Sequence, residues 1–323
     1  EGDPEFRSAY AKHVSQIYNA KIDHSEVQIT SGCNQAFVAT VLALAGHGDR
    51  ILMMRPCYFN HESTLGMLGV GIDYVDCDDD GGLLPNCALI DAAIRPQTRA
   101  IALVSPNNPA GVEYPAETLQ AFYDLCKSRK IALIVDETYR DFDSRTGAPH
   151  ALFSNPDWAD TLIHLYSFSK AYRLTGHRVG ALIASEARLS EVEKFLDTVT
   201  ICPNQIGQRA ALWGMQNLQD WLAGERLEIL DRRAAIEENF APLAAKGWTL
   251  KGCGAYFAYV QHPFEIPSNE LAKNLVRDAG VLVLPATMFM PDEIKGGANH
   301  LRIAFANIDR AGVGELIARL AAL

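Results

Sequence analysis

The sequence predicts an α/β protein with two unequal domains: a large domain built on a mostly parallel, doubly wound sheet, and a smaller α+β domain. Two observations predict this fold class. Between residues 27 and 185, short apolar runs alternate with helical patterns, as expected of crossover connections between parallel strands. After about Trp213 this rhythm changes to a long charged helical stretch followed by shorter elements. The chain has 323 residues, of which 48% are hydrophobic, so it can bury a sizeable core.

Seven apolar runs are predicted as the strands of the large sheet. The clearest helical patterns between them are residues 34–46, which end in glycine, and residues 115–130, which open with proline and close with basic side chains. In chain order the strands are VQIT (27–30), RILMM (50–54), IDYVD (72–76), RAIALVS (99–105), IALIVDE (131–137), TLIHLYS (161–167) and VGALIAS (179–185).

The residues after Trp213 predict the smaller domain. A long charged segment, residues 218–247, is expected to be helical, as are residues 268–280 and the end of the chain. The remaining elements are predicted at WTLKG (248–252), AYFAYVQH (255–262), VLVLPA (281–286) and HLRIAFA (300–306).

Near the N-terminus, four apolar residues repeat at helical spacing, and we expect this first helix to pack onto the second domain. They are Phe6, Tyr10, Val14 and Ile17. The predicted large domain is therefore residues 26–215, and the predicted small domain is residues 1–25 together with 216–323.

The composition argues against several classes of partner. The formal net charge is -10 and the pI is about 5.4, whereas surfaces that bind nucleic acid or anionic membranes need a basic excess. No apolar run approaches the ~18 residues of a membrane span. The charged start EGDPEFR is unlike a signal peptide and resembles a point within a longer chain. The seven cysteines form no C-x-x-C pair and indicate a reduced compartment, which we take to be the cytoplasm.

In open parallel sheets, ligands bind beyond the carboxyl ends of the strands, so the residues that follow each strand are candidates for a site. After residues 27–30, Ser31 and Gly32 allow a tight turn, and the next helix offers free N–H groups to an anion. A glycine turn with a helix cap would have the same pattern. After residues 50–54, Tyr58 or Phe59 could lie against a flat ligand or belong to the core.

Polar side chains follow the next two central strands. Asn108, in the turn SPNNPAG, can donate a hydrogen bond to an oxygen, although turn chemistry also explains this segment. Asp136 ends a hydrophobic strand, and Tyr139 lies just beyond it. A carboxylate in this place needs a cationic partner unless it caps a helix.

The segment SFSKAYRLTGHRVG, residues 167–180, carries the reactive group. Lys170 follows the hydroxyl residues Ser167 and Ser169 where an apolar strand meets a loop, and Arg178 can bind a phosphate through two parallel hydrogen bonds. The strand ends together supply an amine, a carboxylate, an aromatic face, an oxygen donor and a phosphate cup. One ligand needs all five: pyridoxal 5′-phosphate, whose aldehyde forms an imine with lysine and whose ring nitrogen needs an anionic partner.

The same residues resemble the pyridoxal-phosphate enzymes of the type I fold, and among them the class I/II aminotransferases, over essentially the whole chain. SFSKAYRLTGHRVG is similar to the family's lysine signature, and NNPAG is similar to its N-P-T-G turn. The resemblance implies that Lys170 forms the internal aldimine and that Asp136 pairs with the pyridinium nitrogen. It also implies that Asn108 and Tyr139 donate to the phenolic oxygen of the ring.

The resemblance implies the remaining contacts as well, and no metal ligand. The phosphate would be bound by the cup and by the lysine segment, that is, by Gly32, Cys33, Asn34, Ser167, Ser169 and Arg178. Tyr58 would stack on the ring. Arg302, in HLRIAFA, would hold the α-carboxylate of the substrate beside Asn108.

Three features depart from the family pattern. Family members carry several dozen residues before the segment that EGDPEFR resembles, including a tyrosine that reaches the phosphate of the neighbouring subunit. Because of this tyrosine, the resemblance implies a homodimer with shared active sites. The family's P-G-x-x-F-G loop reads PATMFMP, with Ala286 and Met290 in place of glycines. Asn34 stands where aspartate-specific bacterial relatives often carry lysine, so aspartate is not the expected substrate.

The implied activity is transfer of an amino group between an L-amino acid and a 2-oxo acid. Lys170 would form the imine and then move a proton between Cα and the cofactor, while Asp136 would stabilise the quinonoid. Two alternatives use nearly the same residues. One is a carbon–sulfur β-lyase or ring-forming synthase of the same fold, and the other is the aminotransferase-like sensor domain of certain bacterial transcription regulators. The sequence leaves open which amino acid and oxo acid are used.

Overall fold

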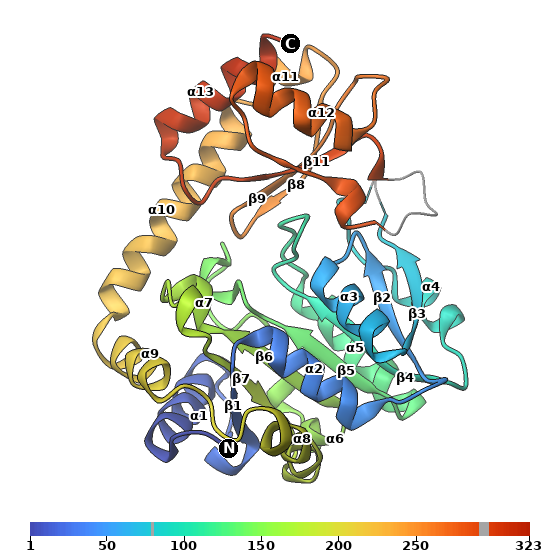
Figure 1. Cartoon of the computed structure of the whole chain (residues 1–323), viewed down its shortest axis with the longest axis vertical. Coiled ribbons are helices and arrows are strands. Elements are labelled where there is room, and N and C mark those ends of the chain that lie inside the picture. Colours follow the sequence, from blue (N-terminus) through green and yellow to red (C-terminus); the bar gives the residue numbers. More distant parts are fainter. Residues whose placement is uncertain (79–80, 291–296) are drawn as a thin grey trace.

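The computed structural model describes residues 1–78, 81–290 and 297–323. It has two lobes, each built around one sheet, and the helix α10 (Gln219–Glu238) runs along one side from the larger lobe to the smaller (Figure 1). The predicted α/β class, with a mostly parallel large sheet and a smaller α+β unit, is confirmed. The exact domain boundaries stay a prediction.

The larger sheet has seven strands in the order β1-β7-β6-β5-β4-β2-β3. From β6 to β3, neighbouring strands are parallel, whereas β7 pairs antiparallel with both β6 and β1. All seven predicted strands are present: β1 (Val27–Thr30), β2 (Arg50–Arg55), β3 (Gly71–Asp76), β4 (Thr98–Val104), β5 (Ala132–Asp136), β6 (Leu162–Ser167) and β7 (Gly180–Ile183).

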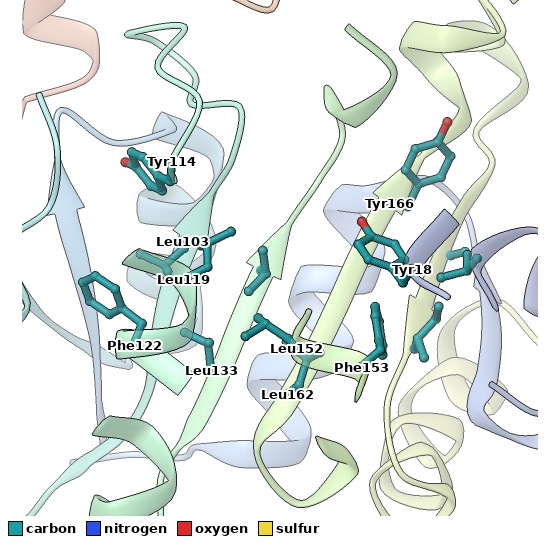
Figure 2. Close-up of a cluster of buried hydrophobic side chains, with 14 of the residues drawn as sticks. Tyr18, Leu103, Tyr114, Leu119, Phe122, Leu133, Leu152, Phe153, Leu162 and Tyr166 are labelled. Atoms are coloured by element: carbon teal, nitrogen blue, oxygen red, sulfur yellow. The ribbon is translucent and has the colours of Figure 1, made fainter. Parts of the chain in front are cut away.

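Both faces of this sheet are buried under helices, which explains why its strands are nearly continuous apolar runs. In β5, Leu133 belongs to one buried cluster and Ile134 to another, because successive side chains point to opposite faces. Figure 2 shows the first cluster, in which Phe122 lies beside strand residues such as Leu133. The helices of this lobe are α1 (Pro4–Tyr18), α2 (Cys33–Leu44), α3 (Phe59–Leu68), α4 (Cys87–Ala93), α5 (Ala116–Arg129), α6 (Trp158–Thr161), α7 (Phe168–Ala171), α8 (Glu186–Val199) and α9 (Gln205–Asn217).

The position expected for the first helix is wrong. α1 packs on the larger lobe, where Phe6 and Tyr10 are fully buried in the same cluster as the large sheet. The rings of Phe6 and Phe168 lie 5.2 Å apart, and those of Tyr10 and Tyr166 lie 5.8 Å apart. The helical repeat shows which face of α1 is apolar, but it carries no information about which apolar surface that face meets.

The smaller lobe has an antiparallel four-stranded sheet in the order β10-β11-β9-β8, covered by helices that share one buried core. Its elements beyond α10 are β8 (Thr249–Gly254), β9 (Phe257–Gln261), β10 (Leu284–Pro285), β11 (His300–Ala304), α11 (Ala241–Ala244), α12 (Ser268–Asn274) and α13 (Arg310–Ala321). Two expectations differ in extent. The strand expected at 281–286 is reduced to two residues, and the helix expected at 268–280 ends in a π-helical turn, Leu275–Ala279.

Short 3-10 turns complete the fold: His24–Glu26, Arg140–Phe142, Leu152–Ser154, Thr175–His177 and Ala286–Met288. The seven cysteines are free, and the cytoplasmic location inferred from them stays a prediction. Within the described ranges, no helix combines the length and the apolar character needed to cross a membrane.

Candidate active site

Nearly all of the predicted site residues line one cavity at the carboxyl ends of the parallel strands. Its volume is about 400 Å³. The lining residues are Cys33, Asn34, Tyr58, Val104, Asn108, Asp136, Thr138, Tyr139, Ser167, Ser169, Lys170, Thr175 and Arg178. Of the predicted residues, Gly32 and Arg302 lie outside this lining, and each contacts a side chain that belongs to it.

A tight backbone turn at Gly32 forms the cup at the start of α2. Gly32 has a φ of 87°, which favours glycine, and a Cβ at this position would lie 2.1 Å from Nη2 of Arg178, so a side chain here would displace the guanidinium from the cup. Nη1 of Arg178 donates to the Ser169 hydroxyl at 3.4 Å and to the Thr175 carbonyl at 3.0 Å. Free N–H groups and a cation therefore meet at one end of the cavity, as an anion requires.

Lys170 lies on α7, the single helical turn that follows β6 directly. Burial lowers the pKa of Lys170, and the positive charges of Arg302 and Arg178 lower it further. A lysine with a lowered pKa supplies the neutral amine more readily than an exposed lysine, which suits attack on a carbonyl and transfer of protons.

Asp136, at the end of β5, is 3% exposed. Its Oδ1 accepts hydrogen bonds from the backbone N–H of Thr138 at 3.0 Å and from the Thr138 hydroxyl at 2.6 Å. Nε2 of His61 lies 3.2 Å from Oδ2. Burial by itself raises the pKa of Asp136, but the contacts with His61 and Thr138 lower it, and the net pKa lies below the ordinary value. The carboxylate is thus held ionised beside the cavity.

Arg302, on β11, reaches the cavity from the smaller lobe. Its Nη1 donates to Oδ1 of Asn108 at 2.8 Å. Its guanidinium carbon also lies 4.6 Å from the ring centroid of Phe257 and 4.9 Å from that of Phe289. Nδ2 of Asn108 lies 3.5 Å from the Tyr139 hydroxyl. Burial raises the pKa of Tyr139, which keeps this hydroxyl protonated as a hydrogen-bond donor.

Comparison with known proteins identifies the family. The profile of "Aminotransferase class I and II" matches residues 1–320. The chain belongs to this family. This aminotransferase is 29% identical to aromatic aminotransferase ISS1 of Arabidopsis thaliana, over 99% of this chain and 79% of that protein. It is also 29% identical to the valine–pyruvate aminotransferase of Mycobacterium tuberculosis, over 94% of this chain and 77% of that protein.

The fold agrees with the family. A mutant of the aspartate aminotransferase of Thermus thermophilus superposes on this chain with a TM-score of 0.90 at 24% identity, covering 99% of this chain and 86% of that one. The chain is therefore an aminotransferase, an enzyme that transfers amino groups, in a family that depends on pyridoxal phosphate and acts on amino acids and 2-oxo acids. The names of these relatives support transamination over the lyase and sensor alternatives.

Two side chains that contact Asp136, His61 and Thr138, were not predicted from the sequence. Both leave a local signal beside a predicted residue. His61 follows Tyr58, the N-cap of α3, by three positions, and the rings of the two residues lie 5.2 Å apart. Thr138 follows Asp136 by two positions, the spacing at which an aspartate commonly accepts hydrogen bonds from its own chain.

The loop PATMFMP, which departs from the family pattern, connects the two lobes. Ala286 is fully buried, and the carbonyl of Phe289 accepts a hydrogen bond from the backbone N–H of Cys57 at 3.0 Å. The loop therefore packs between the lobes, and its Phe289 ring lies 4.9 Å from the guanidinium of Arg302. Pro291, the last residue of the loop, lies outside the described residues.

Proposed function

We propose that this aminotransferase holds pyridoxal 5′-phosphate on Lys170 and transfers the amino group of an L-amino acid to a 2-oxo acid. The observation that carries the proposal is that a single cavity brings Lys170 between an anion cup and an ionised carboxylate. The cup at Gly32 and Arg178 suits the phosphate, and Asp136 suits a protonated ring nitrogen.

When bound, pyridoxal phosphate supplies an electron sink for the negative charge that develops at the substrate Cα. Asp136 would support this role, because a carboxylate that stays ionised can pair with a protonated ring nitrogen. Asn108 and Tyr139 offer an amide and a phenol, both able to donate to the ring oxygen. Tyr58, which lines the cavity, is placed to cover a face of the ring.

Lys170 has two roles in this proposal. Its amine would hold the aldehyde of the cofactor between turnovers. Once the substrate amine had displaced it, the neutral Lys170 would be free to take a proton from the substrate Cα and to deliver a proton to the former aldehyde carbon of the cofactor. The lowered pKa of Lys170 favours the neutral base that the first of these proton transfers requires.

Arg302 is proposed to bind the α-carboxylate of the substrate. Its guanidinium contacts the rings of Phe257 and Phe289 and donates a hydrogen bond to Asn108. A planar cation positioned by these contacts can still bind a carboxylate through its remaining N–H groups, which orients the bonds around Cα.

A half-reaction tests the proposal. Borohydride should attach the cofactor irreversibly to Lys170, as located by peptide mapping. With a good amino donor and no acceptor, the protein should release one equivalent of 2-oxo acid per bound cofactor and no ammonia, and an added 2-oxo acid should reverse the change in absorbance. Release of ammonia or thiol, with the absorbance recovering unaided, would favour β-elimination. No change with any donor would favour the sensor alternative.

We also propose a homodimer. Three large apolar side chains cluster around the segment that joins α8 and α9: Val199 is 60% exposed, Ile201 76% and Ile206 75%. The Thr200 hydroxyl accepts a hydrogen bond from Nε2 of Gln35, on the helix of the phosphate cup, at 2.5 Å. A second copy of the chain covering this patch would bring the two sites close to their shared interface.

Ile201→Asp should shift the protein toward monomer, because the substitution places a charge in the proposed interface. Light scattering over a dilution series should show the mass halving at a protein concentration at least about tenfold higher than for the wild type. Leu227→Asp, at an apolar residue of α10 that is 64% exposed, is the matched control and should leave the mass unchanged. A stable and fully active wild-type monomer would contradict the dimer.

A further inference from the structure

The turn that carries Asn108 is closed on itself. The N–H of Asn107 donates to the carbonyl of Val112, and the N–H of Gly111 donates to the carbonyl of Asn107, both at 2.8 Å. Oδ1 of Asn107 also accepts from the N–H of Ala110 at 3.0 Å. This turn, residues 107–112, is therefore a rigid part of the larger lobe.

The smaller lobe touches this turn with its backbone. A Cβ on Gly254 would lie 2.1 Å from the carbonyl oxygen of Gly111, and a Cβ on Gly252 would lie 2.4 Å from that of Ala110. Both obstacles are backbone atoms, which cannot rotate away as the end of a flexible side chain can. Any side chain at either glycine would force the two lobes apart here.

The glycines lie in the same sheet as Arg302. Gly252 on β8 is opposite Tyr259 on β9, which is opposite Arg302 on β11, so the three residues form one row across the sheet. At the far end of this row, Arg302 donates to Asn108 in the same turn of the larger lobe. The smaller sheet therefore contacts the 107–112 turn at both ends of this row, through the backbone of Gly252 at one end and through the Arg302–Asn108 hydrogen bond at the other.

We infer that Gly252 and Gly254 are positioning residues: their backbone contact with the turn sets the distance at which Arg302 meets the substrate carboxylate. The inference rests on the proposed role of Arg302. Relieving a contact of 2.1 Å requires the hairpin to move by roughly 1 Å. A displacement of that size at an orienting group lowers reactivity by about tenfold to a hundredfold.

The test uses Gly252→Ala and Gly254→Ala. Neither glycine has a positive φ, so the added methyl group acts through the contact alone, whereas Gly111, with a φ of 74°, would add backbone strain. Gly314→Ala is the matched control, because a Cβ on this glycine of α13 meets nothing within 4 Å. Arg302→Ala shows the result when the carboxylate contact is lost completely.

The readout compares two reagents that displace Lys170 from the cofactor, methoxyamine and aminooxyacetate. They share the reactive aminooxy group, and only aminooxyacetate carries a carboxylate. The wild type should react faster with aminooxyacetate. In the Gly252 and Gly254 variants the ratio of the two rates should fall by about tenfold or more toward that of Arg302→Ala, while the methoxyamine rate and the bound cofactor stay unchanged. Gly314→Ala should keep the wild-type ratio.

Hydrogen exchange of the holoprotein provides a second readout that does not depend on reactivity. Backbone amides of residues 107, 108, 110–112 and 252–257 should exchange faster in the two variants than in the wild type and in Gly314→Ala.

Wild-type rate ratios and wild-type exchange in both variants would overturn the inference, as would a loss of reactivity equal for both reagents. A wild type with bound cofactor but no preference for aminooxyacetate would overturn the role of Arg302, and the inference with it. A wild type without bound cofactor would instead refute the proposed function.

Discussion

Lys170→Ala should lower amino transfer by roughly 10⁴-fold or more, because one side chain both holds the cofactor and moves the Cα proton. Among the described residues that line the cavity, Lys170 is the only lysine, so no neighbouring amine can replace it. The short α7 and the buried β6 before it keep the rest of the cavity in place when the side chain is truncated. The variant should also lose the covalent adduct that borohydride forms with the wild type.

The measurement combines mass spectrometry of the reduced protein with the single-turnover rate for a good amino donor. Lys194→Ala is a suitable control, since Lys194 is exposed on α8 and paired with Glu191, and it should behave as the wild type. Retention of a reducible adduct on another lysine in Lys170→Ala, at a comparable rate, would remove Lys170 from the centre of the site.

Asp136→Asn should keep the cofactor bound but lower turnover by about a hundredfold or more. The substitution preserves shape and can still accept hydrogen bonds from Thr138. It removes the charge, however, and a neutral amide cannot keep the ring nitrogen protonated. Turnover is therefore expected to fall much more than affinity for the cofactor. Near-normal turnover in this variant would refute the assignment of Asp136.

The substitution His61→Phe distinguishes the contribution of His61 to turnover from that of the Asp136 charge itself. Phenylalanine keeps the stacking on Phe37, whose ring lies 3.8 Å from that of His61, but removes the nitrogen near Asp136. Because Thr138 still donates two hydrogen bonds, the loss of turnover should be smaller than in Asp136→Asn. The pH dependence of turnover should also shift, since the pKa of Asp136 rises when His61 no longer lowers it. An unchanged pH profile would show that His61 serves only packing.

Most of the site could be predicted because parallel strands end at the same edge of the sheet. Asp136 and Lys170 belong to segments that are more than thirty residues apart, yet both follow a buried apolar strand, and β5 and β6 are parallel neighbours. His61 was missed because it reaches an oxygen of Asp136 from another element, and spacing along the chain does not reveal such a contact. Thr138 has a local signal, its two-residue spacing from Asp136, but that spacing alone does not distinguish a site residue from an ordinary turn. Arg302 was identified by resemblance alone, since an arginine in an antiparallel strand has no distinctive local pattern.

The sequence by itself determined the alternation of strands and helices, the two-part organisation and the chemistry that follows each strand, because period and residue type are local properties. The tertiary structure decided where separate elements meet. It placed α1 on the large sheet, turned β7 antiparallel to both of its neighbours, β6 and β1, and brought Arg302 of the smaller lobe to Asn108 of the larger one. These outcomes depend on which apolar surfaces remain to be covered and on how closely two backbones can approach, and both are set only when the whole chain packs.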